Sequence, residues 1–368
     1  MRKYLYEIIV GEKKGFLATV VKLGLLVLSL FYGLVLSVIS LLYKLHILRS
    51  IRLNTKVISI GNITWGGTAK TPLVAFIASY LRGKGYRIAI LSRGYKRKMA
   101  SQTRLILNGR DLHSNTLTFE EVGDEALLLS QGLADVIVGV DKDRIRCAQK
   151  IRERFNPDIF ILDDGFQYWR LYRDLDIVTI DATNPFGNQH ILPAGIMRQP
   201  KSALKRADIF VITKTNINPH IQDLESELKI INPRALIVEA GYKILGLYEF
   251  SDTARNLIPL SDFKNKSLAC LCGIADPASF EKMLYDSGIN IVKAFRFPDH
   301  HYYTKQDMDD ILTVCKSSGI EIIITTEKDL IRLKDYLVDL ERIRFFVLKI
   351  ELKIKQDEAF TKRISCLL

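Results

Sequence analysis

Cysteine is scarce in this chain, which has only five in 368 residues. The number is odd and the residues are scattered, which excludes a paired disulfide framework and favours a reducing compartment. Cys270 and Cys272 lack both the two-residue spacing and the second half of a zinc site, so we assign them to a buried strand.

Internal repeats and low-complexity stretches are also missing. With 48% hydrophobic and 26% charged residues, the composition excludes disordered and collagen-like architectures. Acidic residues are in the minority, 41 against 53 Lys and Arg, which gives a net charge of +12 and a pI near 9.3. Such a balance suits an anionic partner, namely a nucleic acid, a phosphorylated ligand or an acidic membrane surface.

One segment contains no charge at all, the apolar run Leu23–Tyr43. A bilayer core needs about 20 apolar residues in a helix, so the run is long enough to span. A buried helix of a soluble domain and a cleaved signal peptide are the weighed alternatives. Basic residues on both sides leave the orientation open, and Lys22 and Lys44 suit a helix that lies flat in the interface. The sequence therefore predicts membrane attachment, with spanning or flat placement undecided.

After residue 55 short apolar runs alternate with amphipathic segments, the pattern of a parallel sheet in an α/β layer fold. The expected strands are Lys56–Ile60, Arg87–Leu91, Asp135–Val140, Asp158–Leu162, Leu175–Ile180, Asp208–Thr213, Ser267–Gly273, Ile291–Phe297 and Ile320–Thr325. The expected helices are Pro72–Lys84, Glu121–Gln131, Arg144–Phe155, Pro277–Ser287 and Lys305–Ser317. Two further strands, Ala235–Ile244 and Arg344–Ile354, are expected to pair as a connection between a larger and a smaller α/β domain.

A glycine-rich loop follows the first of these strands and opens a helix. Its residues Gly66, Gly67 and Thr68 can present backbone N–H groups to phosphates at the positive end of the helix. Lys70 would reach the transferring phosphate, and the Thr71 hydroxyl would hold Mg²⁺. The strict phosphate-loop pattern fails at Thr64 and Ala69, where glycines are expected, so an ordinary glycine-rich turn is the alternative.

Two carboxylates, Asp163 and Asp164, end a hydrophobic strand. Ligands of open α/β sheets bind at the carboxyl ends of strands, and hard oxygen ligands beside a triphosphate suit Mg²⁺. A solvated turn is the simpler alternative. A glycosyltransferase metal site is another, but it leaves the Lys70 loop unexplained.

Eight short blocks, in order from about residue 56 to 335, resemble the tetraacyldisaccharide 4'-kinase (lipid A 4'-kinase) family. They are Gly61–Pro72, Ser92–Tyr95, Gly123–Glu125, Asp163–Gln167, Leu192–Gly195, Arg206–Asp208, Phe297–His301 and Thr326–Asp329. Each block is weak alone, and the ordered set is specific. The family's membrane-associated amino-terminal helix matches the apolar run.

The resemblance implies an ATP- and Mg²⁺-dependent transfer of phosphate to the 4'-hydroxyl of tetraacyldisaccharide 1-phosphate in lipid A biosynthesis. It implies a phosphate-loop NTPase-like domain and a smaller α/β domain with the active site in the cleft. The expected domains are a membrane-associated helix region at 1–50, a nucleotide-binding kinase domain at 51–234, and a strand linker with the C-terminal α/β domain at 235–368.

The resemblance also assigns site residues. Asp124 matches the carboxylate that acts as base on the sugar hydroxyl, and His300 or His301 would partner it from the second domain. Arg198 falls among the nucleotide-binding residues. Gln199 stands where the family has a Glu associated with Mg²⁺, so it would offer the metal a neutral oxygen.

The predicted partners are an anionic glycolipid substrate and the bacterial inner membrane, with the catalytic domains on the cytoplasmic face where ATP is available. No nucleic acid and no protein partner is expected. The alternatives are a membrane-tethered nucleotide-binding switch and, because of Ala69 and Gln199, a catalytically impaired lipid-binding relative.

Overall fold

The computed structural model describes residues 8–9, 15–95, 97, 102–112, 117–264, 266–337 and 343–368. The chain divides into two compact units. The first unit contains residues 1–91, 144–240 and 354–368, and the second contains 92–143 and 241–353. The predicted domain boundaries put residues 92–143 into a domain of residues 51–234, which differs from this division by contacts. The predicted domains themselves stay a prediction.

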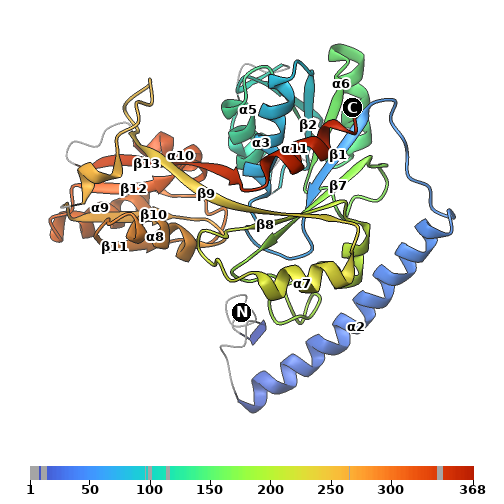
Figure 1. Ribbon diagram of the computed structural model, residues 1–368. Coiled ribbons are helices and arrows are strands. Elements are labelled where there is room, and N and C mark those ends of the chain that lie inside the picture. Colours follow the sequence, from blue (N-terminus) through green and yellow to red (C-terminus); the bar gives the residue numbers. More distant parts are fainter. Residues whose placement is uncertain are drawn as a thin grey trace. The chain divides into compact units, whose positions relative to one another are not determined.

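A parallel sheet forms the centre of the first unit (Figure 1), with strand order β9-β8-β7-β1-β6-β2. The strands are β1 (Lys56–Gly61), β2 (Ile88–Ser92), β6 (Ile159–Asp163), β7 (Leu175–Asp181), β8 (Ile209–Thr213) and the first part of β9 (Leu236–Glu249). Most of their residues are buried because helices cover both faces, and apolar residues therefore dominate these strands.

The helices of the first unit pack on both sides of this sheet. On one side, α7 (Gln222–Ile231) and the 3₁₀ turn η1 (Lys201–Arg206) close an apolar cluster with β7 and β8 that includes Phe166, Phe210 and Leu228. Helix α3 (Lys70–Gly83) contacts β1 and β6, and α11 (Asp357–Ser365) packs on α3 through Phe76 and Phe360. Helices α6 (Arg144–Phe155) and α2 (Phe16–Lys44) also belong to this unit.

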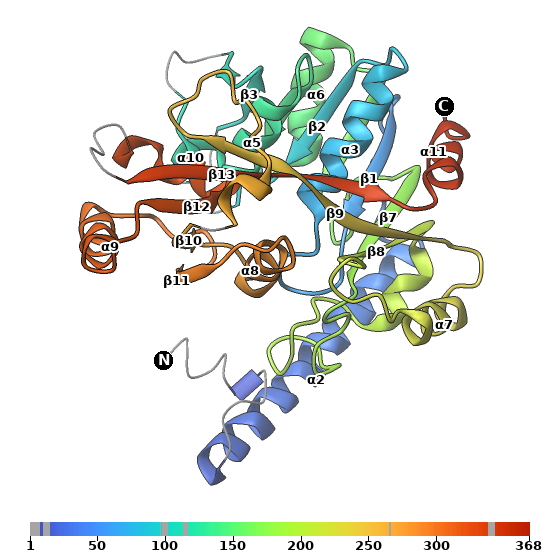
Figure 2. The same ribbon diagram turned by 60° about the vertical axis from the view of Figure 1, so that its left-hand side comes forward.

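The second unit contains four parallel strands (Figure 2), ordered β11-β10-β12-β13, and β13 is followed by β9 in the sheet order. Its strands are β10 (Leu268–Cys272), β11 (Ile291–Arg296), β12 (Ile322–Thr326) and β13 (Arg344–Ile354). Helices α8 (Pro277–Asp286), α9 (Lys305–Ser317) and α10 (Glu327–Leu333), with turns η2 (Leu260–Phe263) and η3 (Lys334–Tyr336), complete it, and an apolar cluster lies on each face. Cys270 and Cys272 are buried in β10, as predicted.

Residues 92–143 add a small substructure to the second unit. It has antiparallel strands β3 (Arg104–Leu107), β4 (Arg110–Asp111) and β5 (Ile137–Val140), with helices α4 (Phe119–Val122) and α5 (Asp124–Gly132). The single helix predicted over Glu121–Gln131 is wrong, because Gly123 has a positive φ of 90° and breaks it into α4 and α5. Helix α5 packs on α10, which joins the substructure to the rest of the unit.

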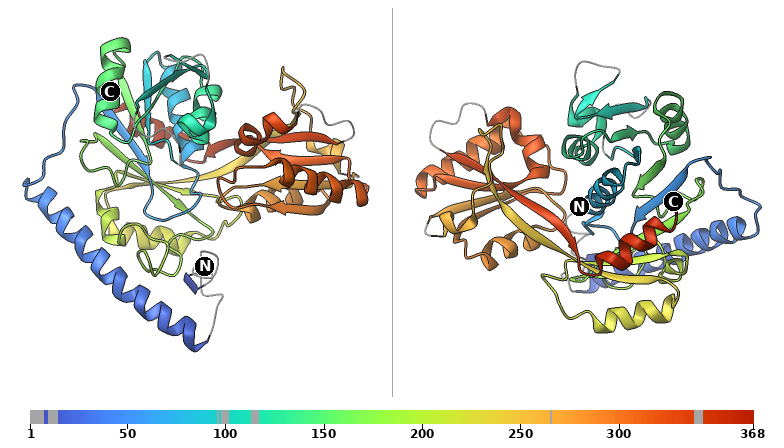
Figure 3. Two further views of the ribbon diagram at one scale, coloured as in Figure 1. Left: turned by 180° about the vertical axis from the view of Figure 1, so that it is seen from behind. Right: turned by 45° about the horizontal axis from the view of Figure 1, so that its top comes forward.

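The predicted strand pair is confirmed, since β9 and β13 are neighbours in the sheet order. Each of the two strands runs along the chain from one unit into the other. Helix α2 is one continuous helix in both views of Figure 3 and belongs to the first unit.

Candidate active site

The glycine-rich loop connects β1 to α3, as predicted. The buried Asn62 side chain donates to Thr68 Oγ1 at 2.8 Å, and Thr68 Oγ1 lies 2.9 Å from Thr179 Oγ1 on β7. These bonds fix both ends of the loop, while Gly66 and Gly67 are exposed. The exposed backbone therefore lies directly before the helix start, where N–H groups favour an anion.

Ala69 takes the conformation that a glycine would take. Its φ is 60° and its ψ is 27°, in the left-handed region, and it directly precedes the first residue of α3. That conformation costs an L-residue about 1–2 kcal/mol. The loop therefore holds its turn despite the substitution, with some strain at this position.

The two carboxylates after β6 have different surroundings. Asp163 is buried at the end of the strand, whereas Asp164 follows it with a positive φ of 52°. The Arg198 guanidinium donates two hydrogen bonds, of 2.8 and 2.7 Å, to the Asp164 carboxylate. Lys70 Nζ lies 3.7 Å from Asp164 Oδ1. Burial alone would raise the pKa of the Asp164 carboxyl, but Lys70 and Arg198 outweigh it and hold that pKa well below its usual range.

Arg198 is also connected to the phosphate loop. Its guanidinium donates to Asn62 Oδ1, and its backbone N–H donates to Ile63 O at 2.6 Å. The Trp65 N–H donates to Ile196 O at 2.7 Å, so residues 196–198 run beside the loop like a short strand. The arrangement gathers Lys70, Arg198 and Asp164 at the start of α3, a set suited to binding phosphate.

Gln199 is 2% exposed. Its Oε1 accepts a hydrogen bond of 3.2 Å from Arg206 and one of 3.4 Å from Gln167. Burial lowers the pKa of Arg206 to about 10. The Gln199 oxygen predicted to bind Mg²⁺ thus faces the Arg206 guanidinium, and its metal role stays a prediction.

The described residues contain no group of three or more His, Cys, Asp or Glu that could hold a metal ion. A nucleotide-bound Mg²⁺ needs less from a protein, since phosphates and water supply most of its oxygen ligands. Thr71 in the first turn of α3 offers a half-buried hydroxyl, and Asp163 and Asp164 offer carboxylates. The chemistry of these donors fits Mg²⁺ carried by a nucleotide.

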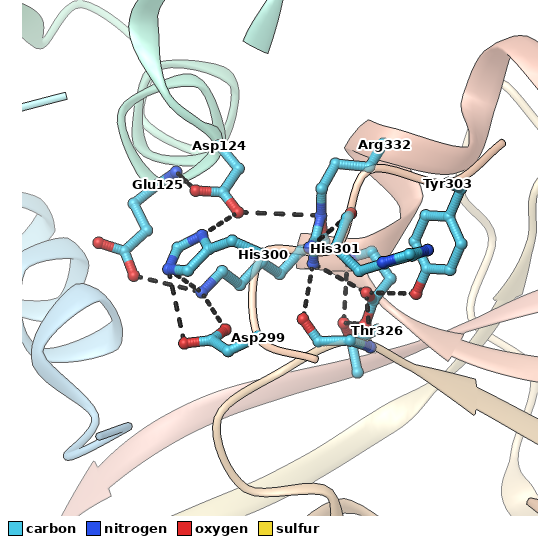
Figure 4. A network of polar contacts seen from close by, with 11 residues as sticks. Asp124, Glu125, Asp299, His300, His301, Tyr303, Thr326 and Arg332 are labelled. Atoms are coloured by element: carbon cyan, nitrogen blue, oxygen red, sulfur yellow. Dashed lines mark hydrogen bonds and ion pairs between the residues drawn. The ribbon is translucent and has the colours of Figure 1, made fainter. Parts of the chain in front are cut away.

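In the second unit, Asp124 is the first residue of α5 and is only 5% exposed. A Cβ on Gly123 would come within 3.3 Å of the Gly94 Cα, so two of the short sequence blocks pack directly together here. Asp124 Oδ2 lies 2.8 Å from His300 Nδ1 (Figure 4), and Oδ1 accepts from the Glu125 N–H. Burial would raise the pKa of Asp124, but His300, Lys328 and Arg332 lower it to about 2.

His300 connects Asp124 to Lys328. Lys328 Nζ lies 3.3 Å from His300 Nε2, and an ammonium can only donate, so Nε2 accepts and the ring proton sits on Nδ1 toward Asp124. Lys328 stays charged, because Glu125, Asp124 and Asp299 raise its pKa against the effect of burial. His300 has a positive φ of 58°, a strained backbone typical of functional sites.

A small pocket opens at this group. It is lined by Tyr95, Phe119, Gly123, Asp124, His300, Tyr302 and Arg332. Arg332 is held by Asp329 at 2.8 Å and places its Nε 3.8 Å from Asp124 Oδ2. The buried carboxylate therefore faces a pocket between aromatic rings and a fixed guanidinium.

His301 faces another way. Its Nε2 lies 3.0 Å from Asp307 at the start of α9, and its ring stacks on Phe297. Of the two predicted histidines, the structure therefore pairs His300 with Asp124. Asp124 and His300 also belong to the same compact unit, whereas the predicted boundaries put them in different domains.

Lys328 and Arg332 also lie at the Asp124–His300 pair, and the sequence pattern did not predict either of them there. The block Thr326–Asp329 already contained Lys328. Nothing in the sequence showed that α10 packs against α5 and brings its Lys and Arg side chains to Asp124.

A parallel α/β sheet with a phosphate-loop turn, and a buried carboxylate–histidine pair, define an enzyme of the phosphoryl-transfer class. Comparison with known proteins is more specific. The family model described as LpxK, tetraacyldisaccharide-1-P 4'-kinase, matches residues 21–368. Among curated relatives named tetraacyldisaccharide 4'-kinase, the one from Halothermothrix orenii is 34% identical over 96% of this chain and 95% of its own length. The one from Pelobacter propionicus is 37% identical over 83% and 81%.

A solved structure agrees. LpxK from Aquifex aeolicus, crystallised in complex with ATP, superposes with a TM-score of 0.74 at 29% identity, covering 94% of this chain and 99% of that one. The chain belongs to the tetraacyldisaccharide 4'-kinase family. It is a kinase that transfers phosphate to the 4'-hydroxyl of a lipid A precursor.

Proposed function

We propose that the phosphate-loop residues bind ATP and that Asp124, held by His300, accepts the proton of the 4'-hydroxyl of tetraacyldisaccharide 1-phosphate. The hydrogen bond of 2.8 Å between Asp124 and His300 carries the second assignment. A hydroxyl nucleophile needs a positioned proton acceptor, and phosphoryl transfer otherwise depends on placement and charge.

For ATP, the exposed Gly66–Gly67 backbone and the start of α3 would hold the phosphates, with Thr68 and Ala69 shaping the turn. Lys70 and Arg198 would give up part of their contact with Asp164 to pair with phosphate oxygens. Thr71, Asp163 and Asp164 would hold Mg²⁺, and Gln199 remains a candidate. Mg²⁺, when bound with ATP, adds positive charge at the β- and γ-phosphates.

For the acceptor, Asp124 would act as an ionised carboxylate. Lys328 donates to His300 Nε2, which fixes the Nδ1–H toward Asp124 and keeps the carboxylate oriented. Arg332 stabilises its charge from 3.8 Å. The proton of the hydroxyl would pass to Asp124 as the hydroxyl oxygen bonds to the γ-phosphorus of ATP, and the bond between that phosphorus and the bridging oxygen of the departing ADP would break.

The histidine pair provides a matched control for this assignment. We expect Asp124→Asn and His300→Ala to lower kcat by roughly 10²–10⁴-fold, the usual contribution of a general base, without changing the KM for ATP. His301→Ala should keep most of the activity, because His301 bonds to Asp307 instead. The assay is phosphate transfer from labelled ATP to the disaccharide 1-phosphate. Loss of activity in His301→Ala but not in His300→Ala would refute the assignment.

We also propose that α2 lies flat on the cytoplasmic face of the inner membrane. The helix is long and apolar, with 6% of its most apolar stretch buried, and Leu30 and Phe31 are 74% and 63% exposed. Ser29 and Tyr32, in its middle, bond to residues 191–198 of the first unit. A helix that crossed the bilayer would place these middle residues in the hydrocarbon, away from the unit that carries the phosphate loop. The flat placement instead turns the exposed apolar face to one leaflet.

Labelling tests this placement. In a variant with Cys366→Ser, which removes the exposed native thiol, single Gly15→Cys and His46→Cys substitutions mark the two ends of α2. We expect a membrane-impermeant maleimide to label both from the side that carries the catalytic units. Labelling of position 15 only from the opposite side would show a spanning helix.

A further inference from the structure

We propose that Ser29 and Tyr32 of α2 position Arg198 at the phosphate loop, so that the apolar helix supports the ATP site as well as attaching the chain to the membrane. The proposal rests on the function proposed above, in which Arg198 and Lys70 bind phosphate.

Two polar side chains in the middle of α2 bond to one segment of the first unit. Ser29 Oγ donates to Ile191 O at 2.8 Å and accepts from the Ala194 N–H at 2.9 Å. Tyr32 Oη donates to the backbone carbonyl of Arg198 at 3.2 Å. Gly33 lets the helix approach closely, because a Cβ there would lie 2.8 Å from Ile191 Cδ1.

The same segment contacts the phosphate loop on its other side. The Arg198 N–H donates to Ile63 O, and the Trp65 N–H donates to Ile196 O. The Arg198 side chain reaches Asp164 and Asn62. Residues 191–198 therefore form a single layer of chain between α2 and the loop that would bind phosphate.

Attachment to a membrane does not require these contacts. An apolar helix binds a leaflet through its exposed hydrophobic face, which here includes Leu30 and Phe31. Ser29 is 5% exposed on a helix whose other side chains are mostly exposed, and burying a hydroxyl is favourable only when it is hydrogen-bonded. Both hydroxyls form hydrogen bonds with the backbone of residues 191–198. The helix therefore fixes the backbone from which the Arg198 side chain extends toward the phosphate loop.

Tyr32→Phe tests the idea because it removes one hydroxyl and keeps the ring. We expect the KM for ATP, and the Kd of a ribose-labelled fluorescent ATP analogue measured without lipid, to rise roughly threefold to tenfold, as for loss of one hydrogen bond. The KM for the disaccharide and flotation with phosphatidylglycerol-containing vesicles should not change. Ser37→Ala is the matched control. Among the described residues, the Ser37 hydroxyl bonds to Gly33 O within the helix, so this variant should leave all four values unchanged.

A double-mutant cycle separates an effect of Tyr32 on the position of Arg198 from a general weakening of the ATP site. If Tyr32 acts through the Arg198 side chain, Tyr32→Phe should change ATP affinity less than about twofold in an Arg198→Ala background. Ser29→Ala should behave in the same way. Equal effects of Tyr32→Phe in both backgrounds, or no effect in the native one, would overturn the proposal. If the native chain fails to phosphorylate the disaccharide, the proposed function fails, while the analogue affinities still decide this inference.

Discussion

The charge of Asp124 should stabilise the second unit in a way that depends on pH. Replacing Asp124 by Asn keeps one oxygen that can accept from His300 Nδ1–H. It removes the negative charge and the second oxygen, which accepts from the Glu125 N–H; only the loss of the charge makes the effect depend on pH. Lowering the pKa of Asp124 from 3.8 to about 2 corresponds to about 2 kcal/mol of unfolding free energy at neutral pH. Since the folded pKa lies below the unfolded one, this contribution is complete above about pH 5 and is lost as the pH falls toward 2.

The assay is urea unfolding followed by circular dichroism between pH 2.5 and 7. Both tryptophans, Trp65 and Trp169, belong to the first unit, so their fluorescence on the same samples serves as an internal control. We expect the free energy of unfolding of the native chain to exceed that of Asp124→Asn by about 2 kcal/mol near pH 6. This difference should become smaller below pH 4. Asp307→Asn, the equivalent change at the more exposed His301 pair, should give a smaller pH-dependent difference. A difference for Asp124→Asn that stays constant from pH 7 to 2.5 would refute the argument.

Three further predictions concern the phosphate loop and Gln199. Lys70→Ala should lower phosphate transfer by roughly three orders of magnitude, because it removes the cation at the transferring phosphate; near-normal turnover would exclude Lys70 from the mechanism. Ala69→Gly should raise turnover at saturating Mg²⁺ by up to about fivefold, because relief of the roughly 1 kcal/mol of strain at the positive φ of Ala69 limits the gain. An unchanged rate would show that this strain does not affect catalysis. Gln199→Glu should lower the Mg²⁺ concentration for half-maximal activity, whereas an unchanged Mg²⁺ dependence with altered thermal stability would assign the new carboxylate to Arg206.

The local pattern of the sequence was enough for most of the fold. The helices predicted at Arg144–Phe155 and Lys305–Ser317 have those bounds in the structure, because one buried face repeats along each of them and Thr304 caps the second. The break at Gly123 was not predictable from periodicity, since the apolar pattern continues through it. It results from the left-handed backbone of one residue at a tightly packed contact with Gly94.

The group proposed to bind nucleotide was also largely predictable, because its residues are close in sequence or end adjacent parallel strands. Lys70 lies near Asp164 since β1 and β6 are paired neighbours and both end at the same edge of the sheet. The Asp124–His300 pair was harder to predict. Asp124 and His300 are 176 residues apart, and the choice between two adjacent histidines depends on a backbone turn at His300 that no sequence pattern indicates.

Gln199 shows why a residue type at an aligned position is not enough to assign a ligand. An amide oxygen can serve a metal or a guanidinium, and its neighbours decide which. Here η1 folds the chain back, so that Arg206, seven positions later, lies over the Phe166 ring and donates to Gln199 Oε1. A neutral oxygen beside a buried guanidinium leaves that charge only partly compensated, which agrees with the lowered pKa of Arg206. A carboxylate at position 199 would have to divide its two oxygens between Arg206 and Mg²⁺, so the Gln199→Glu experiment measures which of the two cations this corner of the site favours.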